Sequence, residues 1–283
     1  MKFDAVIGNP PYNRDIFLDF IEFGYILSNK YTTMITPAKW ISNNDEARTA
    51  GDVNFADFRN RLIKKIYTVV FYPCCRDVFN ISQTDGITYF IMDKTDHNEI
   101  EVINKCIDIS YFNSESKRSI CNRETLYNIG NEILCALPKY ESFKFQKISG
   151  TFRYRVYAYN KISGYDWFET TKSRYLLGLM KVMDSKDTDE LSNLSPAMKC
   201  IFESDNILEC QSYKSYLETR AVRFLVMLTL SRMTGILNDD CFRFVPNQYN
   251  FNHTYTDIEL YKILGIDKYP EYIEVIENTI KER

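Results

Sequence analysis

The stretch FDAVIGNPPYN, residues 3–13, joins a short apolar run to a turn-forming segment. The run Phe3–Ile7 predicts a β-strand. Gly8 and the two prolines end it, because proline fixes φ and has no amide hydrogen to donate. In parallel α/β sheets, ligands bind at the edge where the strands end. Asn9–Tyr12 is therefore the first candidate site, although a rigid turn leaving a strand would use the same residue types.

The rest of residues 1–95 alternates between helical and strand-like patterns. Apolar residues at helical spacing predict helices at Ile16–Leu27 and Phe55–Lys65. Runs rich in β-formers predict strands at Tyr31–Thr36, Ile66–Tyr72 and Ile87–Met92. This alternation predicts βαβ units, an α/β fold and a largely parallel sheet.

The charge balance changes after residue 95. Residues 111–180 hold 11 Lys and Arg against 6 Asp and Glu, in a chain whose net charge is −3. Within this segment, TFRYRVYAY alternates strongly and predicts a strand at Thr151–Tyr159. A basic segment inside an acidic chain favours contact with phosphates, whereas a solvated strand face is the simpler structural interpretation.

The C-terminal part is predicted to be helical. One long helix is expected at Ser212–Thr234, and shorter ones at Thr256–Gly265 and Pro270–Glu282. Thr256 and Glu259 fit a capping box at the start of the second of these. The chain is therefore divided into residues 1–95 (α/β), 96–210 (α+β) and 211–283 (helical).

Composition restricts the function classes. The eight cysteines include no Cys-x-x-Cys pair and there are two histidines, which argues against a zinc site and for free thiols in a reducing cytosol. The longest apolar stretch, Ala221–Leu230, contains Arg223 and is too short to cross a bilayer. We expect a soluble, cytoplasmic protein without a membrane partner. Ten glycines, none in a Gly-x-Gly pair, leave little room for a glycine-built cofactor loop.

The residue types of the Asn-Pro-Pro-Tyr turn suit chemistry on an exocyclic amine. The lone pair of such an amine on an adenine ring is delocalised and poorly nucleophilic. The side-chain oxygen of Asn9 and the backbone carbonyl of Pro10 can accept its two hydrogens and so localise and aim that lone pair. Tyr12 can stack on the base once it is flipped out of the duplex.

FDAVIGNPPYN resembles motif IV of the N6-adenine DNA methyltransferases of bacterial restriction–modification systems, most closely their gamma-ordered group. The similarity continues in TTMITPAKWI (residues 32–41), RDVF (76–79), ITYFIMDK (87–94) and the segment 242–280. The resemblance implies S-adenosylmethionine as methyl donor, double-stranded DNA as substrate, and site-specific transfer to a flipped adenine. It also implies a partial Rossmann-like sheet, an α+β target-recognition region and C-terminal helices.

The resemblance assigns roles to individual residues. It implies that Asn9 and Pro10 hold the amine, that Tyr12 and Phe79 contact the two faces of the base, and that Pro11 and Phe17 contact the donor. The basic residues placed where the family recognises its target are Lys144, Lys147, Arg153 and Arg155.

The sequence departs from the family in lacking the glycine-rich donor turn. Three explanations follow: a split enzyme whose donor-binding half is a second polypeptide, a catalytically inactive DNA-binding or specificity remnant, or another mode of donor binding. We favour the first, in which Phe3–Ile7 is a free sheet edge where that second polypeptide docks. Methylases acting on protein or RNA tend to share the Asn-Pro-Pro-Tyr loop, but the segment 242–280 gives no reason to choose them.

Overall fold

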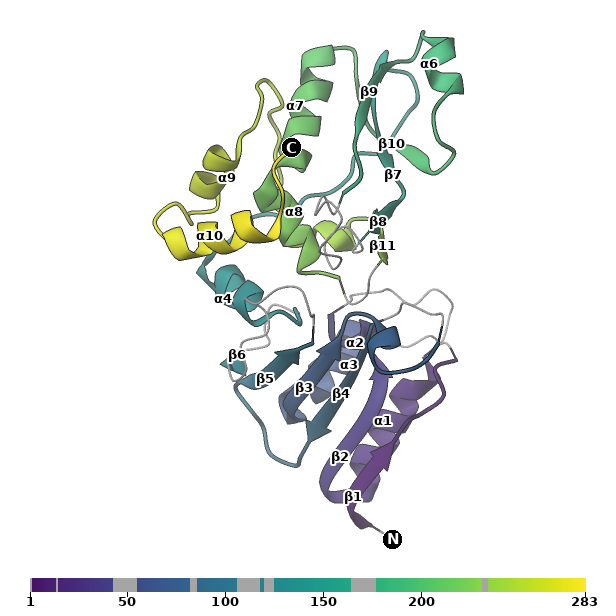
Figure 1. Cartoon of the computed structure of the whole chain (residues 1–283), viewed down its shortest axis with the longest axis vertical. Helices are drawn as coiled ribbons and strands as arrows, with labels where there is room; N and C mark the ends of the chain where they lie inside the picture. Colours follow the sequence, from purple (N-terminus) through teal and green to yellow (C-terminus); the bar gives the residue numbers. More distant parts are fainter. Residues whose placement is uncertain are drawn as a thin grey trace. The chain divides into compact units, whose positions relative to one another are not determined.

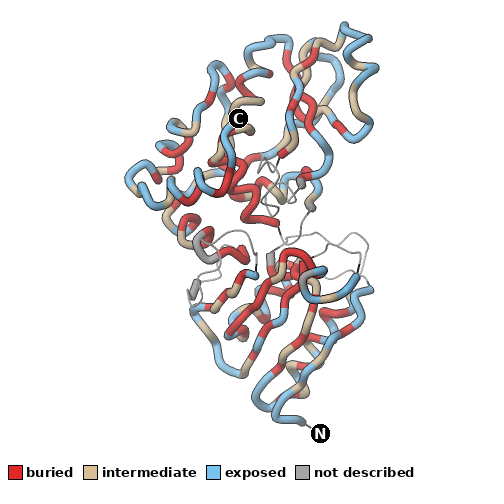
Figure 2. Tube along the Cα trace, viewed as in Figure 1, coloured by how far each residue is buried: buried red, intermediate tan, exposed pale blue. Residues whose placement is uncertain are grey.

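The computed structural model forms two compact units, Met1–Cys135 with Leu228–Met233, and Ala136–Met227 with Thr234–Arg283 (Figure 1). It describes residues 2–13, 15–42, 55–81, 86–105, 118–119, 125–163, 177–230 and 234–283. Buried residues gather inside each unit (Figure 2). The division at residues 95 and 210 stays a prediction.

Unit 1 is built on a mixed six-stranded sheet. Its strands lie in the order β1 (Phe3–Gly8), β2 (Ser28–Pro37), β4 (Ile87–Met92), β3 (Ile66–Tyr72), β5 (Ile100–Asn104) and β6 (Arg118–Ser119). β1 is parallel to β2, and β3 is parallel to β5, as the alternating pattern predicted.

The prediction of a largely parallel sheet was wrong for β4. This strand runs antiparallel to both of its neighbours, β2 and β3. The end of β3 lies opposite the start of β4, with Tyr72 paired with Ile87. The chain therefore turns back at the same edge of the sheet, and no crossover helix is needed.

One face of this sheet is covered by α1 (Ile16–Leu27), α2 (Lys39–Ser42) and α3 (Phe55–Leu62), as Figure 1 shows. Trp40 of α2 is fully buried between Phe58 of α3 and Phe90 of β4, with ring centroids 5.6 Å apart in each case. Such edge-to-face aromatic pairs add to the stabilisation from burial.

The parallel relation of β1 and β2, and of β1 and β3 through the antiparallel β4, brings three strand ends to one edge. The segments that follow β1, β2 and β3 therefore emerge at the same edge of the sheet. The candidate loop Asn9–Tyr12 is the first of them. α4 (Asn128–Ala136) follows Tyr127, whose ring contacts Phe71 of β3 with centroids 6.0 Å apart.

Unit 2 holds two small antiparallel sheets. The first has the order β10 (Met198–Ser204), β7 (Tyr154–Tyr159), β9 (Lys181–Asp184), and the second pairs β11 (Thr234–Ile236) with β8 (Lys161–Ser163). Its helices are α6 (Thr188–Ser192), α7 (Ile207–Glu218), α8 (Arg220–Met227), α9 (Asp257–Ile263) and α10 (Pro270–Thr279). The strand expected at Thr151–Tyr159 is thus present as β7.

The helix expected at Ser212–Thr234 is two helices, not one. Thr219 has an extended backbone (φ −60°, ψ 149°) between α7 and α8, and its hydroxyl donates to the carbonyl of Tyr216 at 2.9 Å. Apolar spacing continues across the break, which is why the pattern alone missed it. The predicted capping by Thr256 is confirmed: its side chain accepts a bond from the amide of Glu259.

Aromatic side chains form the core of unit 2. Tyr213 of α7 stacks on Phe202 of β10 with centroids 4.2 Å apart and an angle of 17° between the rings. Phe251 meets both Tyr213 and Tyr216 edge to face. In the described part of the chain, no helix is long and apolar enough to cross a membrane.

Gly24 lets α1 approach the sheet closely. A Cβ at this position would meet the side chain of Met34 and would lie 3.3 Å from Thr32 Cγ2 and 3.4 Å from Val6 Cγ1. We expect Gly24→Val to lower the free energy of unfolding by about 1–3 kcal/mol, the cost typical of overpacking. Urea unfolding measures this, with Ile26→Val on the exposed side of α1 as the control. Equal stability of the two variants would contradict close packing at Gly24.

Candidate functional site

The Asn9–Tyr12 loop is held against the second strand by Tyr12. The Tyr12 hydroxyl lies 2.8 Å from Asn9 Oδ1 and 3.1 Å from the carbonyl oxygen of Ile35 in β2. A tyrosine has one hydroxyl hydrogen, so it donates fully to one of these acceptors at a time. Pro10 is buried beneath the loop, whereas Asn9 and Pro11 are exposed.

Partial burial keeps the Tyr12 hydroxyl protonated. Desolvation, with a smaller contribution from the nearby Cys75 thiol, raises the pKa of Tyr12 to about 12. Tyr12 is therefore a hydrogen-bond donor over the whole physiological range. The interaction with Cys75 also means that the segment after β3 comes near the candidate loop.

That segment positions Phe79. A short 3-10 turn, Cys75–Asp77, follows β3, and the amide of Phe79 donates to the carbonyl of Cys75 at 2.8 Å. The amide of Ile81 in turn donates to the carbonyl of Phe79 at 2.8 Å. The half-buried Phe79 ring is thus carried at the same edge of the sheet as Tyr12.

The two predicted donor contacts differ in accessibility. Pro11 is exposed, but Phe17 has 0% exposure and lies in the core, with Lys39 Nζ 5.7 Å from its ring centroid. The exposed apolar side chains of the same helix are instead Ile16 and Phe20. Phe17 therefore offers no free ring surface to a ligand in this structure.

Sequence reasoning missed an ion pair beside the loop. Lys39 Nζ lies 2.8 Å from Asp15 Oδ1, and it also lies 4.9 Å from the ring centroid of Phe55. Because Asp15 is spent on this pair, its side chain does not cap α1. The pair joins the turn after β2 to the turn after β1, and local sequence carried no signal of it because the partners are 24 residues apart.

The four basic residues predicted to contact DNA fall into two groups. Lys144 and Lys147 are exposed, and within the described residues neither forms an ion pair. Arg153 is paired, with Nε and Nη2 at 2.9 and 2.8 Å from Asp184 Oδ2. Arg155 is also paired, with Nε 3.8 Å from Glu203 Oε2.

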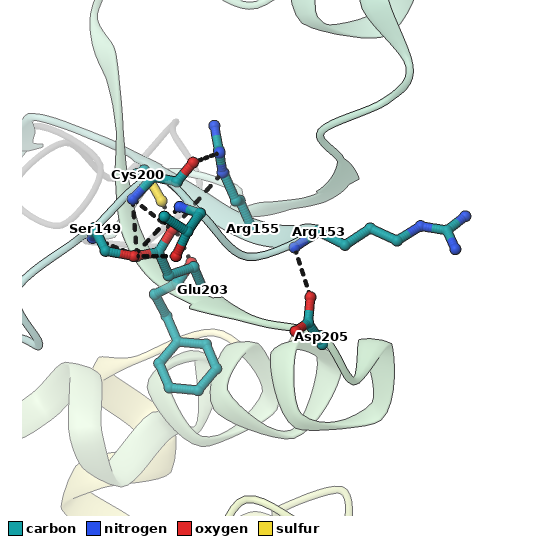
Figure 3. Close-up of polar contacts among 9 residues, drawn as sticks. Ser149, Arg153, Arg155, Cys200, Glu203 and Asp205 are labelled. Carbon is teal, nitrogen blue, oxygen red and sulfur yellow. Dashed lines mark hydrogen bonds and ion pairs between the residues drawn. The ribbon is translucent and has the colours of Figure 1, made fainter.

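Glu203 is the centre of this second group (Figure 3). Its carboxylate accepts bonds from the amide and, at 2.7 Å, the hydroxyl of Ser149, and from the Gly150 amide at 3.0 Å. Gly150 has φ +76°, so Ser149 and Gly150 form a backbone cradle for an anion. Nη2 of Arg155 donates to the Gly150 carbonyl at 2.5 Å and closes the cluster.

The same contacts govern the ionisation of Glu203. Burial alone would raise the pKa of Glu203, but hydrogen bonds from Ser149 and Gly150 outweigh it and hold the pKa below the ordinary value. The cluster therefore fixes the 149–151 turn at neutral pH. The described residues contain no group of three or more His, Cys, Asp and Glu that could hold a metal ion.

Comparison with known proteins gives one weak relative and a fold likeness. The chain is 33% identical over 106 residues to an "uncharacterized adenine-specific methylase" of Mycoplasma pneumoniae. The match covers 32% of this chain and 24% of the relative, so the chain spans about a quarter of that protein's length. No family model matches.

Two solved structures resemble part of the chain. One belongs to a study of complex assembly and conformational transition of the type I R-M system (TM-score 0.28, 18% identity, 36% of this chain and 24% of that one). The other is a modification subunit of a putative type I restriction enzyme from Vibrio vulnificus (TM-score 0.27, 16% identity, 36% and 25%).

The Glu203 cluster predicts a pH-dependent stability difference. We expect Glu203→Gln to lower the free energy of unfolding at pH 7 by about 1–3 kcal/mol, because it weakens buried hydrogen bonds to a charged acceptor. Since the folded-state pKa is lowered, this stabilisation is complete above the ordinary glutamate pKa of about 4.3 and is lost as pH falls through the folded value.

Urea unfolding between pH 3 and 7 measures the effect. Exposed Glu141→Gln is the control for loss of a negative charge. A Glu203→Gln difference that stayed constant across this range would exclude ionised Glu203 as its source.

Proposed function

We propose that this chain is the catalytic and target-recognition part of a site-specific adenine-N6 DNA methyltransferase of a restriction–modification system. It acts on an adenine flipped out of double-stranded DNA, with S-adenosylmethionine as the methyl donor. The observation that carries the proposal is the amide oxygen of Asn9, held by Tyr12 at the carboxyl end of β1. The relative described as an adenine-specific methylase supports it.

The loop's own residues account for recognition of the amine. Asn9 Oδ1 has two lone pairs, so it can accept one amine hydrogen while the Tyr12 hydroxyl turns to the carbonyl of Ile35, 3.1 Å away. The carbonyl of Pro10, held in the rigid turn, is the proposed acceptor for the second hydrogen. Both acceptors draw the lone pair of the amine out of conjugation with the ring.

Two aromatic side chains are proposed to hold the base. Tyr12 packs on one face and Phe79, carried by the turn after β3, on the other. Lys144 and Lys147 are the proposed phosphate contacts that remain available, whereas Arg153 and Arg155 would have to exchange Asp184 and Glu203 for DNA. The order β1-β2-β4-β3 fits a partial Rossmann-like sheet.

The described residues do not make a complete donor site. Phe17 is sealed in the core, and the sequence contains no Gly-x-Gly turn, which leaves Pro11 as the exposed member of the predicted set. We therefore derive no step through the donor. The alternative, an inactive DNA-binding remnant, draws on this same disagreement and is separated by experiment.

Methyl transfer is tested with a tritiated methyl donor and unmethylated plasmid DNA, with the product of the adjacent reading frame supplied as the donor-binding polypeptide. We expect activity in the mixture and a loss of about 100–1000-fold for Asn9→Ala, because it removes an acceptor aimed at the reacting amine. Asn13→Ala, an exposed asparagine of the same turn, is the control. Activity that survives Asn9→Ala would refute this role, and DNA binding without methylation would favour the remnant.

Tyr12→Phe separates stacking from hydrogen bonding. The ring is kept and the bond to Asn9 is lost, so we expect kcat to fall about 3–10-fold, which corresponds to roughly 1 kcal/mol, with DNA affinity unchanged. Tyr12→Ala should lose both properties. Because the pKa of Tyr12 is about 12, the ratio of wild-type to Tyr12→Phe rates should stay constant between pH 7 and 10. Equal damage from the two substitutions would mean that the Tyr12 hydroxyl is irrelevant.

A further inference from the structure

β1 is an unprotected sheet edge. It pairs with β2 on one side, and no strand of the described residues pairs with its other side. Ile7 is 80% exposed and Phe3 is 48% exposed, and the strand contains no proline or lysine. Soluble proteins usually blunt a free apolar edge with such residues or cover it, so this edge fits a strand-shaped partner.

α1 overhangs that edge with a second apolar stripe. Its buried stripe faces the sheet through Phe17, Ile21 and Gly24, whereas Phe20 and Phe23 are 43% and 60% exposed. Glu22 pairs with Arg61 of α3 at 2.9 Å, which marks the flank of α1 that faces α3. At 100° per residue, Phe20 and Phe23 lie on the opposite flank, beyond β1.

The sheet face opposite α1 is also apolar and open. Ile7 is paired with Thr33, and Thr33 with Ile91, so Ile7 and Ile91 lie in one row on this face. Ile91 is 39% exposed and Tyr31, on the same face of β2, is 52% exposed. The edge is therefore flanked by apolar surface on both faces.

We propose that this edge, with Phe20 and Phe23 on one side and Ile7 and Tyr31 on the other, docks a donor-binding polypeptide that adds a strand parallel to β1. The inference rests on the proposed function and deepens it, because it says where the missing donor site comes from. The partner carries a glycine-rich turn directly after its docking strand, and an apolar helix that covers the face of Ile7 and Tyr31.

The position of Asn9 requires the parallel orientation. Asn9 follows the carboxyl end of β1, so only a parallel strand places its own following turn beside Asn9. An antiparallel strand would bring its turn to the opposite end of the sheet.

A second copy of this chain fits the surface less well. Pairing through a two-fold axis perpendicular to the sheet joins the two β1 strands antiparallel and puts both α1 helices on one face. The side chains of Ile7 and Tyr31 on the other face would then stay uncovered.

The test co-expresses the full chain with the product of the adjacent reading frame that encodes a Gly-x-Gly turn. We expect a 1:1 complex that binds S-adenosylmethionine in calorimetry, whereas the chain alone does not. Ile7→Glu and Phe23→Glu, at exposed positions, should each weaken the complex at least 10-fold. Ile258→Glu, a 68% exposed isoleucine on α9, is the matched control and should leave it unchanged.

Three results would overturn the proposal: no complex, a complex insensitive to Ile7→Glu and Phe23→Glu, or a homodimer of the chain alone that these substitutions dissolve. Donor binding by the chain alone would also overturn it. A complex that obeys the edge substitutions but transfers no methyl group to DNA would instead refute the proposed function and leave the docking surface standing.

Discussion

The parallel ladder between β1 and β2 fixes where the candidate site lies. Because Gly8 is paired with Met34, the turn that leaves β1 opens beside the last residues of β2, and the Tyr12 hydroxyl can reach the Ile35 carbonyl. The antiparallel β4 then returns β3 to the same direction, so Phe79 emerges at the same edge. Two loops more than 60 residues apart in the chain are brought together by strand direction alone.

This arrangement leaves the site strong on one side and incomplete on the other. Toward β2, the loop is tied down by the Tyr12 hydroxyl and by the buried Pro10. Toward the free edge of β1, the described residues offer no second strand. A methyl donor must approach the amine from a direction that the acceptors of Asn9 and Pro10 leave open. The unpaired side of β1 is the part of the sheet where such a site could be added.

The sequence predicted local elements better than their partners. Ile16–Leu27, Ile66–Tyr72 and Ile87–Met92 have the predicted bounds, because strong periodicity or β-branched runs coincide with clear stops. The direction of β4 and the break at Thr219 depend on how segments meet in space, which periodicity does not encode. For the candidate site, the loop Asn9–Tyr12 was found from its residue types, but the burial of Phe17 was not.

Long-range ion pairs were equally invisible. Arg153 and Arg155 read as free cations in a basic segment, yet their partners Asp184 and Glu203 lie 31 and 48 residues away in the chain. A local charge count therefore overstates the positive charge available to a phosphate. Lys144 and Lys147 lack such partners among the described residues, and this gives them precedence over the arginines as phosphate contacts.

The small number of glycines acquires a physical meaning from the structure. Gly24 is used for the close approach of α1 to the sheet, and Gly265 for a turn with φ +66° after α9. Gly150 does form an anion-binding cradle, but the chain's own Glu203 carboxylate fills it. These glycines are committed to internal packing, and none of them follows a strand of the unit 1 sheet. A donor site at that sheet must therefore be built by glycines from another polypeptide, and only β1 has a free side to receive them.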